Sequence, residues 1–192
     1  MEYILAIVMG VCLSAACGFR IFIPLLVAGV TSRMAGIPVP EAMEWVRGDM
    51  ALCCLGVAAV VETVAYYIPY IDNLLDTVSG PLAVVAGAVV MGGMLDAMPD
   101  YLQWTLAIVA GGGAAGAVQA GTTALRATST ATTGGVGNPV VSTAENGFSI
   151  AGSLLAMLAP ILALIGLVIM VVLVWLLVRR LRRRKAKLIS AQ

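Results

Sequence analysis

Five apolar segments constrain the fold of this chain more than any other feature. They cover residues 3–30, 51–68, 81–95, 101–120 and 148–178. A bilayer core needs about 20 helical residues, so segments of this kind predict transmembrane helices. Hydrophobic residues make up 61% of the 192 residues and charged residues 11%, which is more apolar surface than a water-soluble core can bury. The sequence therefore predicts an all-α polytopic membrane protein with about five transmembrane helices.

The first and last segments are too long for a single perpendicular crossing. A continuous helix over either would measure on the order of 45 Å, against a bilayer core of roughly 30 Å. Each segment contains residues that disfavour a straight helix: Gly18 and Pro24 bracket Arg20 in the first, and Pro160 interrupts the last. We therefore expect a broken helix in both segments.

Residues 122–147 form a long stretch rich in Ser, Thr and Gly, with one arginine and one glutamate. One interpretation is an exposed flexible loop. The other is a re-entrant segment, with non-helical backbone at membrane depth that is buried in protein or lines a wet cavity. We favour the second, because a solvated connection of this length normally carries more charge and most connections in compact domains are shorter.

Three short stretches recur in the same order in the two halves of the chain. "CGFRIFIP" is similar to "TALRATST", "PYIDNLLD" to "PVVSTAEN", and "PLAVVAGAVVM" to "PILALIGLVIM". This order predicts an internal repeat, residues 1–98 and 101–178, within one integral membrane domain of residues 1–178. Arg20 and Arg126 are then equivalent positions. Residues 51–68 have no partner segment, which leaves open whether the repeats are inverted.

Six charged residues lie within or beside apolar segments, where a charge is expensive and must face protein or water. They are Arg20, Glu62, Asp72, Asp76, Arg126 and Glu145. Two interpretations are open. The arginines pair with acids and lock the bundle, or they line a solute site, because the fork of donors on a guanidinium suits an anion. If the first segment breaks beside Arg20, we expect the two arginines to converge on one site, within reach of the same small ligand, acid side chain or water.

Polar residues next to these charges complete the predicted solute site. Asp72 and Asp76 share a helix face, which suits a cation or a proton relay, but their position after Pro69 favours acids in the first turn of a helix. The run after Arg126 supplies hydroxyls and exposed amides for an anion cradle. The predicted binding residues are Arg20, Arg126, Ser129, Thr130, Thr132, Thr133, Asn138, Asp72, Asn73, Asp76, Glu62 and Glu145.

Gly112, Gly116 and Ala120 recur every fourth residue in the fourth apolar segment. A helix face with so little side chain lets a second helix come close. We expect this face to pack within the chain or across a homo-oligomer. Tyrosines near segment ends, Tyr66 and Tyr67 among them, predict an aromatic belt at the membrane interface.

The sequence offers few candidate catalytic residues. Histidine is absent, and no GxSxG nucleophile motif occurs. The four cysteines show no CxxC spacing, and we expect all of them to be reduced and buried. They are Cys12, Cys17, Cys53 and Cys54. We therefore expect no enzyme activity, no metal and no cofactor.

A basic tail follows the last apolar segment. The stretch "RRLRRRKAK" at residues 179–187 carries seven of the eleven basic residues. Such a cluster keeps its end of a membrane protein in the cytoplasm and attracts anionic lipid headgroups. We therefore predict a cytoplasmic tail over residues 179–192, an external N-terminus after five crossings, and membrane lipids as partners in place of nucleic acid.

Several motifs together carry a family resemblance. The stretches "GFRIFIPLL", "IPYIDNLLDTVSGPLAVVAGAVV" and "GGGAAGAVQAGTTALRATSTATTGGVGNPVVSTAEN" resemble the bacterial and plastid membrane-protein family catalogued as domain of unknown function 4126. The resemblance covers residues 5–172. It implies that these positions belong to one recurring architecture, and it suggests a bacterial inner membrane as the location.

Three functional classes are compatible with these features. The favoured one is a small transporter or channel for a small anion or ion, with its central site at Arg20 and Arg126. The alternative is a non-transporting scaffold or lipid-binding subunit that packs through small-residue helix faces. An intramembrane enzyme is the least supported. A water-filled cavity that reaches Arg20 favours transport, whereas a dry salt bridge around Arg20 favours the scaffold.

Overall fold

The structure, a computed structural model, describes residues 2–68 and 71–189. Every regular element in these residues is helical, which confirms the all-α fold class. In chain order the elements are α1 (Glu2–Cys17), α2 (Phe22–Ala35), η1 (Glu41–Arg47), α3 (Asp49–Ala65), α4 (Ile71–Met94), α5 (Asp100–Leu106), η2 (Ala107–Gly112), α6 (Gly113–Thr133), α7 (Asn138–Leu158) and α8 (Pro160–Ile189).

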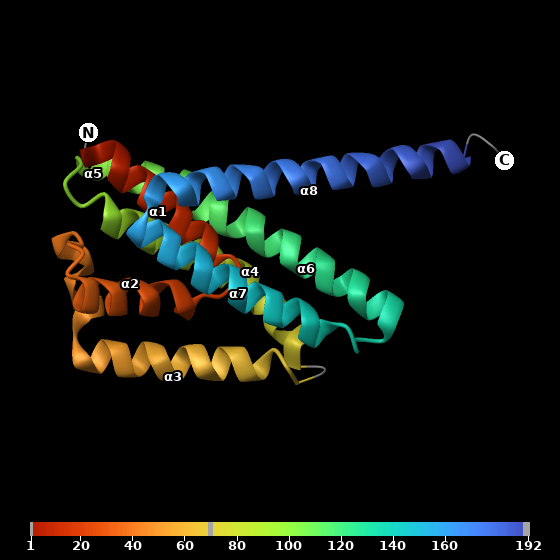
Figure 1. Ribbon diagram of the computed structural model, residues 1–192, viewed down its shortest axis with the longest axis horizontal. Coiled ribbons are helices and arrows are strands. Elements are labelled where there is room, and N and C mark those ends of the chain that lie inside the picture. Colours follow the sequence, from red (N-terminus) through yellow and green to blue (C-terminus); the bar gives the residue numbers. More distant parts are fainter. Residues whose placement is uncertain (1, 69–70, 190–192) are drawn as a thin grey trace.

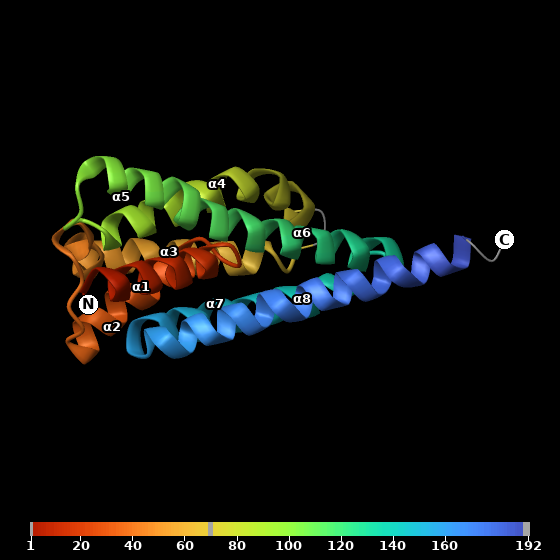
Figure 2. The same cartoon turned by 90° about the horizontal axis from the view of Figure 1, so that it is seen from above.

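The long helices run back and forth along one axis (Figure 1). The N-terminus, η1 and the α4–α5 connection lie at one end, and the α6–α7 turn and the end of α8 lie at the other (Figures 1 and 2). Helix α1 is central, because it contacts α4, α6, α7 and α8. Helix α3 is peripheral and packs mainly against α2 and η1.

The first apolar segment breaks around Arg20, as expected, with α1 ending at Cys17 and α2 beginning at Phe22. Gly18 allows a close approach, because a Cβ there would lie 2.4 Å from the carbonyl oxygen of Ala115. Pro24 falls in the first turn of α2, where a missing N–H leaves no helical bond unmade. Helix α2 then returns toward the end where α1 begins (Figure 1). The segment is therefore a helical hairpin and not one tilted crossing.

Residues 122–147 are helical except for the turn at residues 134–137, so the prediction of non-helical backbone was wrong. The hydroxyls of Thr128 and Thr132 each donate to a carbonyl one turn earlier at 2.8 Å, so these side chains are satisfied without leaving the helix. Gly134, with a φ of +62°, ends α6 in the left-handed conformation that glycine adopts easily. The segment is thus the two arms of an α6–α7 hairpin.

The last apolar segment also breaks, at the predicted proline. Helix α7 ends at Leu158, and Pro160 begins α8, where its fixed φ suits a first helical position. The two helices pack against each other. Helix α8 continues to Ile189, so the backbone of the predicted basic tail extends this helix through residues 179–189.

The small-residue face packs within the chain. Gly112 and Gly116 lie against α4, whereas Ala120 is exposed and does not contribute. The closest approach is one position earlier, where a Cβ on Gly111 would lie 2.5 Å from the carbonyl oxygen of Gly87. The consecutive elements α5, η2 and α6 form one continuous helical stretch, which we call the α5–α6 run. Helix α4 and the α5–α6 run therefore meet backbone to backbone.

The exterior of the bundle is apolar. Large side chains such as Val109, Val140 and Leu173 are 70%, 73% and 60% exposed. The interior in contrast holds several polar and charged residues, Arg20 and Arg126 among the largest of them. This arrangement is the reverse of a water-soluble protein, in which charged side chains are exposed and large apolar patches are rare.

One helical window in the described residues, Leu74–Met94, has the length and hydropathy to cross a membrane by itself. The pair η1 and α3, which meet at a bend of 72°, adds a second if the two are counted as one span. The apolar parts of α1, α2 and α8 are shorter.

The positions matched in the predicted repeat have different local structures. Arg20 lies in the connection between two helices, whereas Arg126 lies within α6. Pro81 is inside α4, whereas Pro160 starts α8. The described residues therefore give the internal repeat no local support.

The four cysteines are free, but they do not share one environment. Cys12 and Cys17 are buried, as expected. Cys53 and Cys54 are exposed, so the expectation of burial was wrong for these two. The reason is their location on α3, which packs mainly against α2 and η1 and lies at the edge of the bundle.

Candidate functional site

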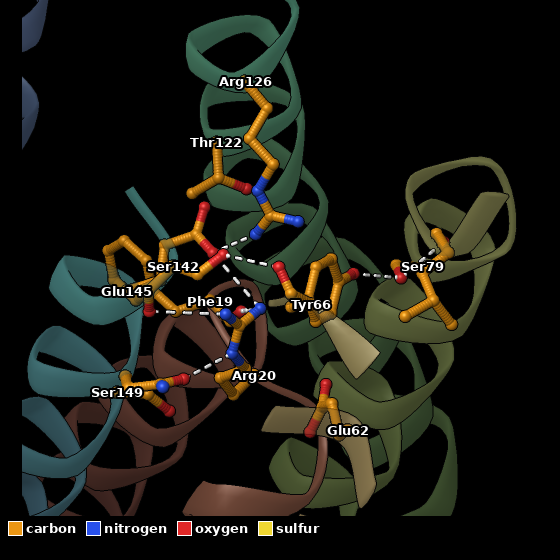
Figure 3. Close-up of polar contacts among 12 residues, drawn as sticks. Phe19, Arg20, Glu62, Tyr66, Ser79, Thr122, Arg126, Ser142, Glu145 and Ser149 are labelled. Atoms are coloured by element: carbon orange, nitrogen blue, oxygen red, sulfur yellow. Dashed lines mark hydrogen bonds and ion pairs between the residues drawn. The ribbon is translucent and has the colours of Figure 1, made fainter. Parts of the chain in front are cut away.

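Five elements bring charged and aromatic side chains to one point inside the bundle (Figure 3). These elements are the α1–α2 connection with Arg20, α6 with Arg126, α7 with Glu145, α4 with Asp76, and the end of α3 with Tyr66. We call this group the arginine cluster: Arg20, Arg126, Glu145, Asp76 and Tyr66.

The two arginines converge on one carboxylate, as expected from the sequence. Nη1 of Arg20 lies 3.1 Å from Oε2 of Glu145, and Nη2 of Arg126 contacts the same oxygen. Nη1 of Arg126 lies 3.0 Å from Oδ1 of Asp76. The side chains of Arg20 and Arg126 are 0% and 1% exposed, so both guanidiniums are buried, whereas the side chain of Asp76 is 9% exposed.

Tyr66 stacks with both arginines. Each guanidinium carbon lies 4.0 Å from the centre of its ring, a distance at which the face of an aromatic ring attracts a cation. Its hydroxyl lies 2.6 Å from Oγ of Ser79 on α4. The prediction that Tyr66 belongs to an interfacial belt was therefore wrong, because the residue is only 3% exposed.

Further contacts fix the guanidinium of Arg20. Its Nε donates to Oδ1 of Asn146 at 2.6 Å, and its Nη2 donates to the carbonyl oxygen of Ser142 at 3.4 Å. Both partners belong to α7. Arg20 also lies just after the C-terminus of α1, where a positive charge offsets the negative end of the helix dipole.

Glu62 satisfies the start of α2. Its two carboxylate oxygens accept hydrogen bonds from the backbone N–H groups of Ile21 and Phe22, at 2.9 and 3.2 Å. The first N–H groups of a helix have no partner within the helix, and a carboxylate both fills that role and favours the positive end of the helix dipole. Glu62 is therefore a cap supplied by α3 to a break in another part of the chain.

Two atoms of the arginine cluster stay unsatisfied. Nε of Arg126 and Oε1 of Glu145 are buried and have no hydrogen-bond partner within the described residues. A buried polar group without a partner typically costs about 1–3 kcal/mol. The cluster can therefore accept further polar contacts at these two atoms.

A second polar group lies next to the cluster and links α4 to α6 and α7. Nδ2 of Asn138 donates to Oδ2 of Asp72 at 2.6 Å and to Oγ1 of Thr130 at 3.1 Å. Asp72 is in the first turn of α4, the position favoured from the sequence. Asp72 and Asp76 thus bind different partners. Among the described residues, no group of three acidic or cysteine side chains is placed to hold a metal ion.

The remaining predicted binding residues lie elsewhere. Thr132 and Thr133 are exposed, and Ser129 lies beside the α6–α7 turn. Oγ1 of Thr133 accepts the backbone N–H of Gly137 at 3.0 Å and so closes that turn. The hydroxyl run therefore stabilises the hairpin and does not join the arginines. The side chain of Asn73 lies outside the described residues.

Sequence reasoning missed the polar face of α7. Ser142, Glu145, Ser149 and Ser153 recur every three or four residues and are all buried. Oγ of Ser149 donates to the carbonyl oxygen of Ala16 at 3.2 Å, which ties this face to the end of α1. Their helical spacing is visible in the sequence, but it predicts a site only if the segment is a helix.

The arginine cluster is separate from an apolar groove of the bundle. That groove has a volume of about 650 Å³, lies between α2, α3 and α7, and is lined by apolar side chains such as Ile23, Val60 and Leu154. None of the five cluster residues lines it. In this conformation the arginines are sealed.

Comparison with known proteins gives a family and no individual relative. No curated protein and no solved structure matches the chain. The family model described as a domain of unknown function (DUF4126) matches residues 7–180, which include every residue of the arginine cluster. The chain therefore belongs to the DUF4126 family.

Proposed function

We propose that the chain is a polytopic membrane protein whose bundle axis lies along the bilayer normal. The apolar exterior supports this, because lipid is the surroundings in which exposed Val, Leu and Ile side chains are stable. Helices α3, α4, the α5–α6 run, α7 and α8 then make five crossings. The α1–α2 hairpin enters from the N-terminal side and carries Arg20 at its tip.

The basic residues after Val178 place the C-terminus in the cytoplasm in this proposal, in contact with anionic lipid headgroups. Five crossings put the N-terminus and η1 on the outer side. The family resemblance is consistent with a bacterial inner membrane. Association into a homo-oligomer stays a prediction.

This topology predicts opposite labelling of two exposed positions. In a chain with Cys53 and Cys54 replaced by alanine, Glu44→Cys in η1 should react with a membrane-impermeant maleimide added to intact cells. Thr132→Cys at the α6–α7 turn should react only after the cells are opened. Both residues are exposed, and η1 and the end of α6, to which they belong, lie at opposite ends of the bundle (Figure 1). Labelling of both from the same side would contradict the proposed orientation.

We further propose that the protein transports a small solute, most simply a small anion, through the region of the arginine cluster. The observation that carries the proposal is a buried set of charges at a helix break, with two polar atoms still unsatisfied. Ionisable groups inside a membrane are expensive and usually mark a solute or proton path. Broken helices near the membrane centre form such sites in many transporters.

A scaffold without transport is the second candidate, and one observation favours it. Arg20 is only 1% exposed and its guanidinium is bound by Glu145, Asn146 and Ser142. In this alternative the cluster locks α1, α6 and α7 together. In the transport proposal the same ion pairs must open during a cycle, and the structure corresponds to a closed state.

A flux assay separates the two candidates. In liposomes containing the purified protein, the wild type should move at least one ion of a panel of small anions faster than protein-free liposomes do. Arg20→Lys keeps the charge but loses the planar fork, so flux should fall by about tenfold or more while the protein stays folded. Arg33→Lys, at an exposed ion pair with Asp49, is the matched control and should keep full flux.

Absence of flux for every ion tested would contradict transport and leave the scaffold. The wild type must in that case be shown to be folded and inserted in the same liposomes. Equal loss of flux in the two lysine variants would contradict a specific role of Arg20.

A further inference from the structure

Two arginines from distant parts of the chain bind the same oxygen of one carboxylate. Nη1 of Arg20 lies 3.1 Å from Oε2 of Glu145, and Nη2 of Arg126 contacts that oxygen too. Oε1 of Glu145 is buried without a partner in the described residues. Paired arginine and carboxylate groups often use both oxygens in parallel hydrogen bonds. Glu145 therefore lies between the guanidiniums but binds them through Oε2 alone, and its Oε1 accepts no hydrogen bond from the described residues.

Other contacts hold both guanidiniums in place. Arg20 donates to Asn146 at 2.6 Å, Arg126 binds Asp76 at 3.0 Å, and both stack on the ring of Tyr66 at 4.0 Å. None of these contacts involves Glu145. Each guanidinium therefore retains partners when the Glu145 carboxylate is removed, and we expect these partners to hold it in place. A site that needs no rearrangement binds its ligand at a lower entropic cost.

We propose that Arg20 and Arg126 form a binding site for a small monovalent anion the size of a carboxylate group, and that Glu145 occupies this site as an internal anion. Without Glu145, the direct ion pairs of the two arginines are reduced to one, between Arg126 and Asp76, and Arg20 has no carboxylate of the described residues in contact with it. One small monovalent anion between the guanidiniums would replace the ion pairs that Glu145 makes with both of them. Glu62, the other nearby acid, forms no ion pair with either arginine in the described residues, and its oxygens accept the N–H groups of Ile21 and Phe22.

This proposal names the solute class of the transport function proposed above, on which its role in flux rests. Binding is measured separately, on purified protein in detergent. Binding without flux in liposomes would contradict transport and leave the anion site standing. Flux without the binding of formate to the two arginines would contradict the anion site alone.

The test removes the internal anion and supplies an external one. Glu145→Ala deletes the carboxylate and leaves room between the guanidiniums. Sodium formate is then titrated against thermal stability, with sodium gluconate, a bulky anion, keeping the ionic strength constant. The concentration of formate for half-maximal stabilisation should be about tenfold or more lower in E145A than in the wild type, whose tethered carboxylate competes at a high effective concentration.

Two matched variants identify the site. Asp76→Ala also deletes a carboxylate of the cluster, but of the two arginines this carboxylate pairs only with Arg126, so formate should stabilise D76A no more than the wild type. Arg20→Met added to E145A removes one of the two guanidiniums and should abolish the response to formate.

The outcomes are distinct. Equal stabilisation of the wild type and E145A, equal rescue of D76A, or a response that persists in the R20M and E145A double variant would each overturn the proposal. If E145A does not fold in gluconate, the folded yield in formate takes the place of the melting curve, and Glu145→Gln, which removes only the charge, is measured alongside. Failure of both variants to fold at every formate concentration would also overturn it, because guanidiniums that formate cannot reach are no binding site.

Discussion

Arg126→Met is expected to lower the free energy of unfolding by about 3–5 kcal/mol, the range typical of breaking a buried ion pair from one side. Arg126 binds both Asp76 and Glu145, and its side chain is 1% exposed. Its loss leaves Asp76 without a cation. Arg20→Met is expected to have a smaller effect, because Glu145 then keeps its contact with Arg126 and no carboxylate loses its only cation.

Unfolding in mixed detergent micelles measures both variants against the wild type. Arg33→Met is the matched control, since its ion pair with Asp49 is exposed and should contribute less than about 1 kcal/mol. Adding Asp76→Asn to R126M removes the unpaired charge and should restore part of the lost stability. The buried ion pair is the wrong explanation if R126M and R33M unfold alike, or if D76N brings no recovery.

Glu62→Leu is expected to lower the free energy of unfolding by about 3 kcal/mol, through the start of α2. Two N–H groups, of Ile21 and Phe22, lose their acceptor, and each unsatisfied donor away from water costs about 1–3 kcal/mol. Glu62→Gln keeps one of the two acceptor oxygens and should lose about half as much.

Hydrogen exchange gives this prediction a local readout. The amides of Ile21 and Phe22 should exchange faster in E62L than in the wild type, while the amides of α7 keep their protection. Glu44→Leu, at an exposed acid in η1, is the control and should change neither stability nor exchange at these amides. If exchange at Ile21 and Phe22 stays at the wild-type rate, Glu62 does not cap α2.

The helical class and the helix breaks were predictable, because both depend on local chemistry. Long apolar segments specify helices, and Gly18, Pro24 and Pro160 mark the two breaks. The direction of the chain after each break was not predictable. A break can leave the two parts in line or fold them back, and contacts such as that of Gly18 with Ala115 decide between these outcomes.

The hairpin of α6 and α7 shows the limit of composition as a guide. Ser and Thr are weak helix formers in water, so a stretch rich in them predicts irregular structure. Hydroxyls that bond to the preceding turn, as those of Thr128 and Thr132 do, remove much of that penalty. A prediction of helix would have aligned Ser142, Glu145 and Ser149 on one face.

The charged residues of the site could be predicted from the sequence, but its uncharged residues could not. Arg20, Arg126, Asp76 and Glu145 stand out because a charge in an apolar segment needs a partner. Tyr66, Ser142 and Asn146 carry no such signal, since tyrosine near a segment end and polar residues in a loop are both ordinary. Their roles depend on five elements meeting at one point, which a single sequence does not specify.

The backbone contact between Gly87 and Gly111 also limits how this molecule can deform. Two backbones this close cannot slide past one another without separating, so we expect α4 and the α5–α6 run to move as one rigid body. Helix α1 is clamped to the same body by Gly18 and by the hydrogen bond from Ser14 to Gly87, at 2.7 Å. Helix α3 in contrast packs mainly on α2 and η1, so a displacement of α3 would lift Tyr66, which follows its last turn, away from both arginines.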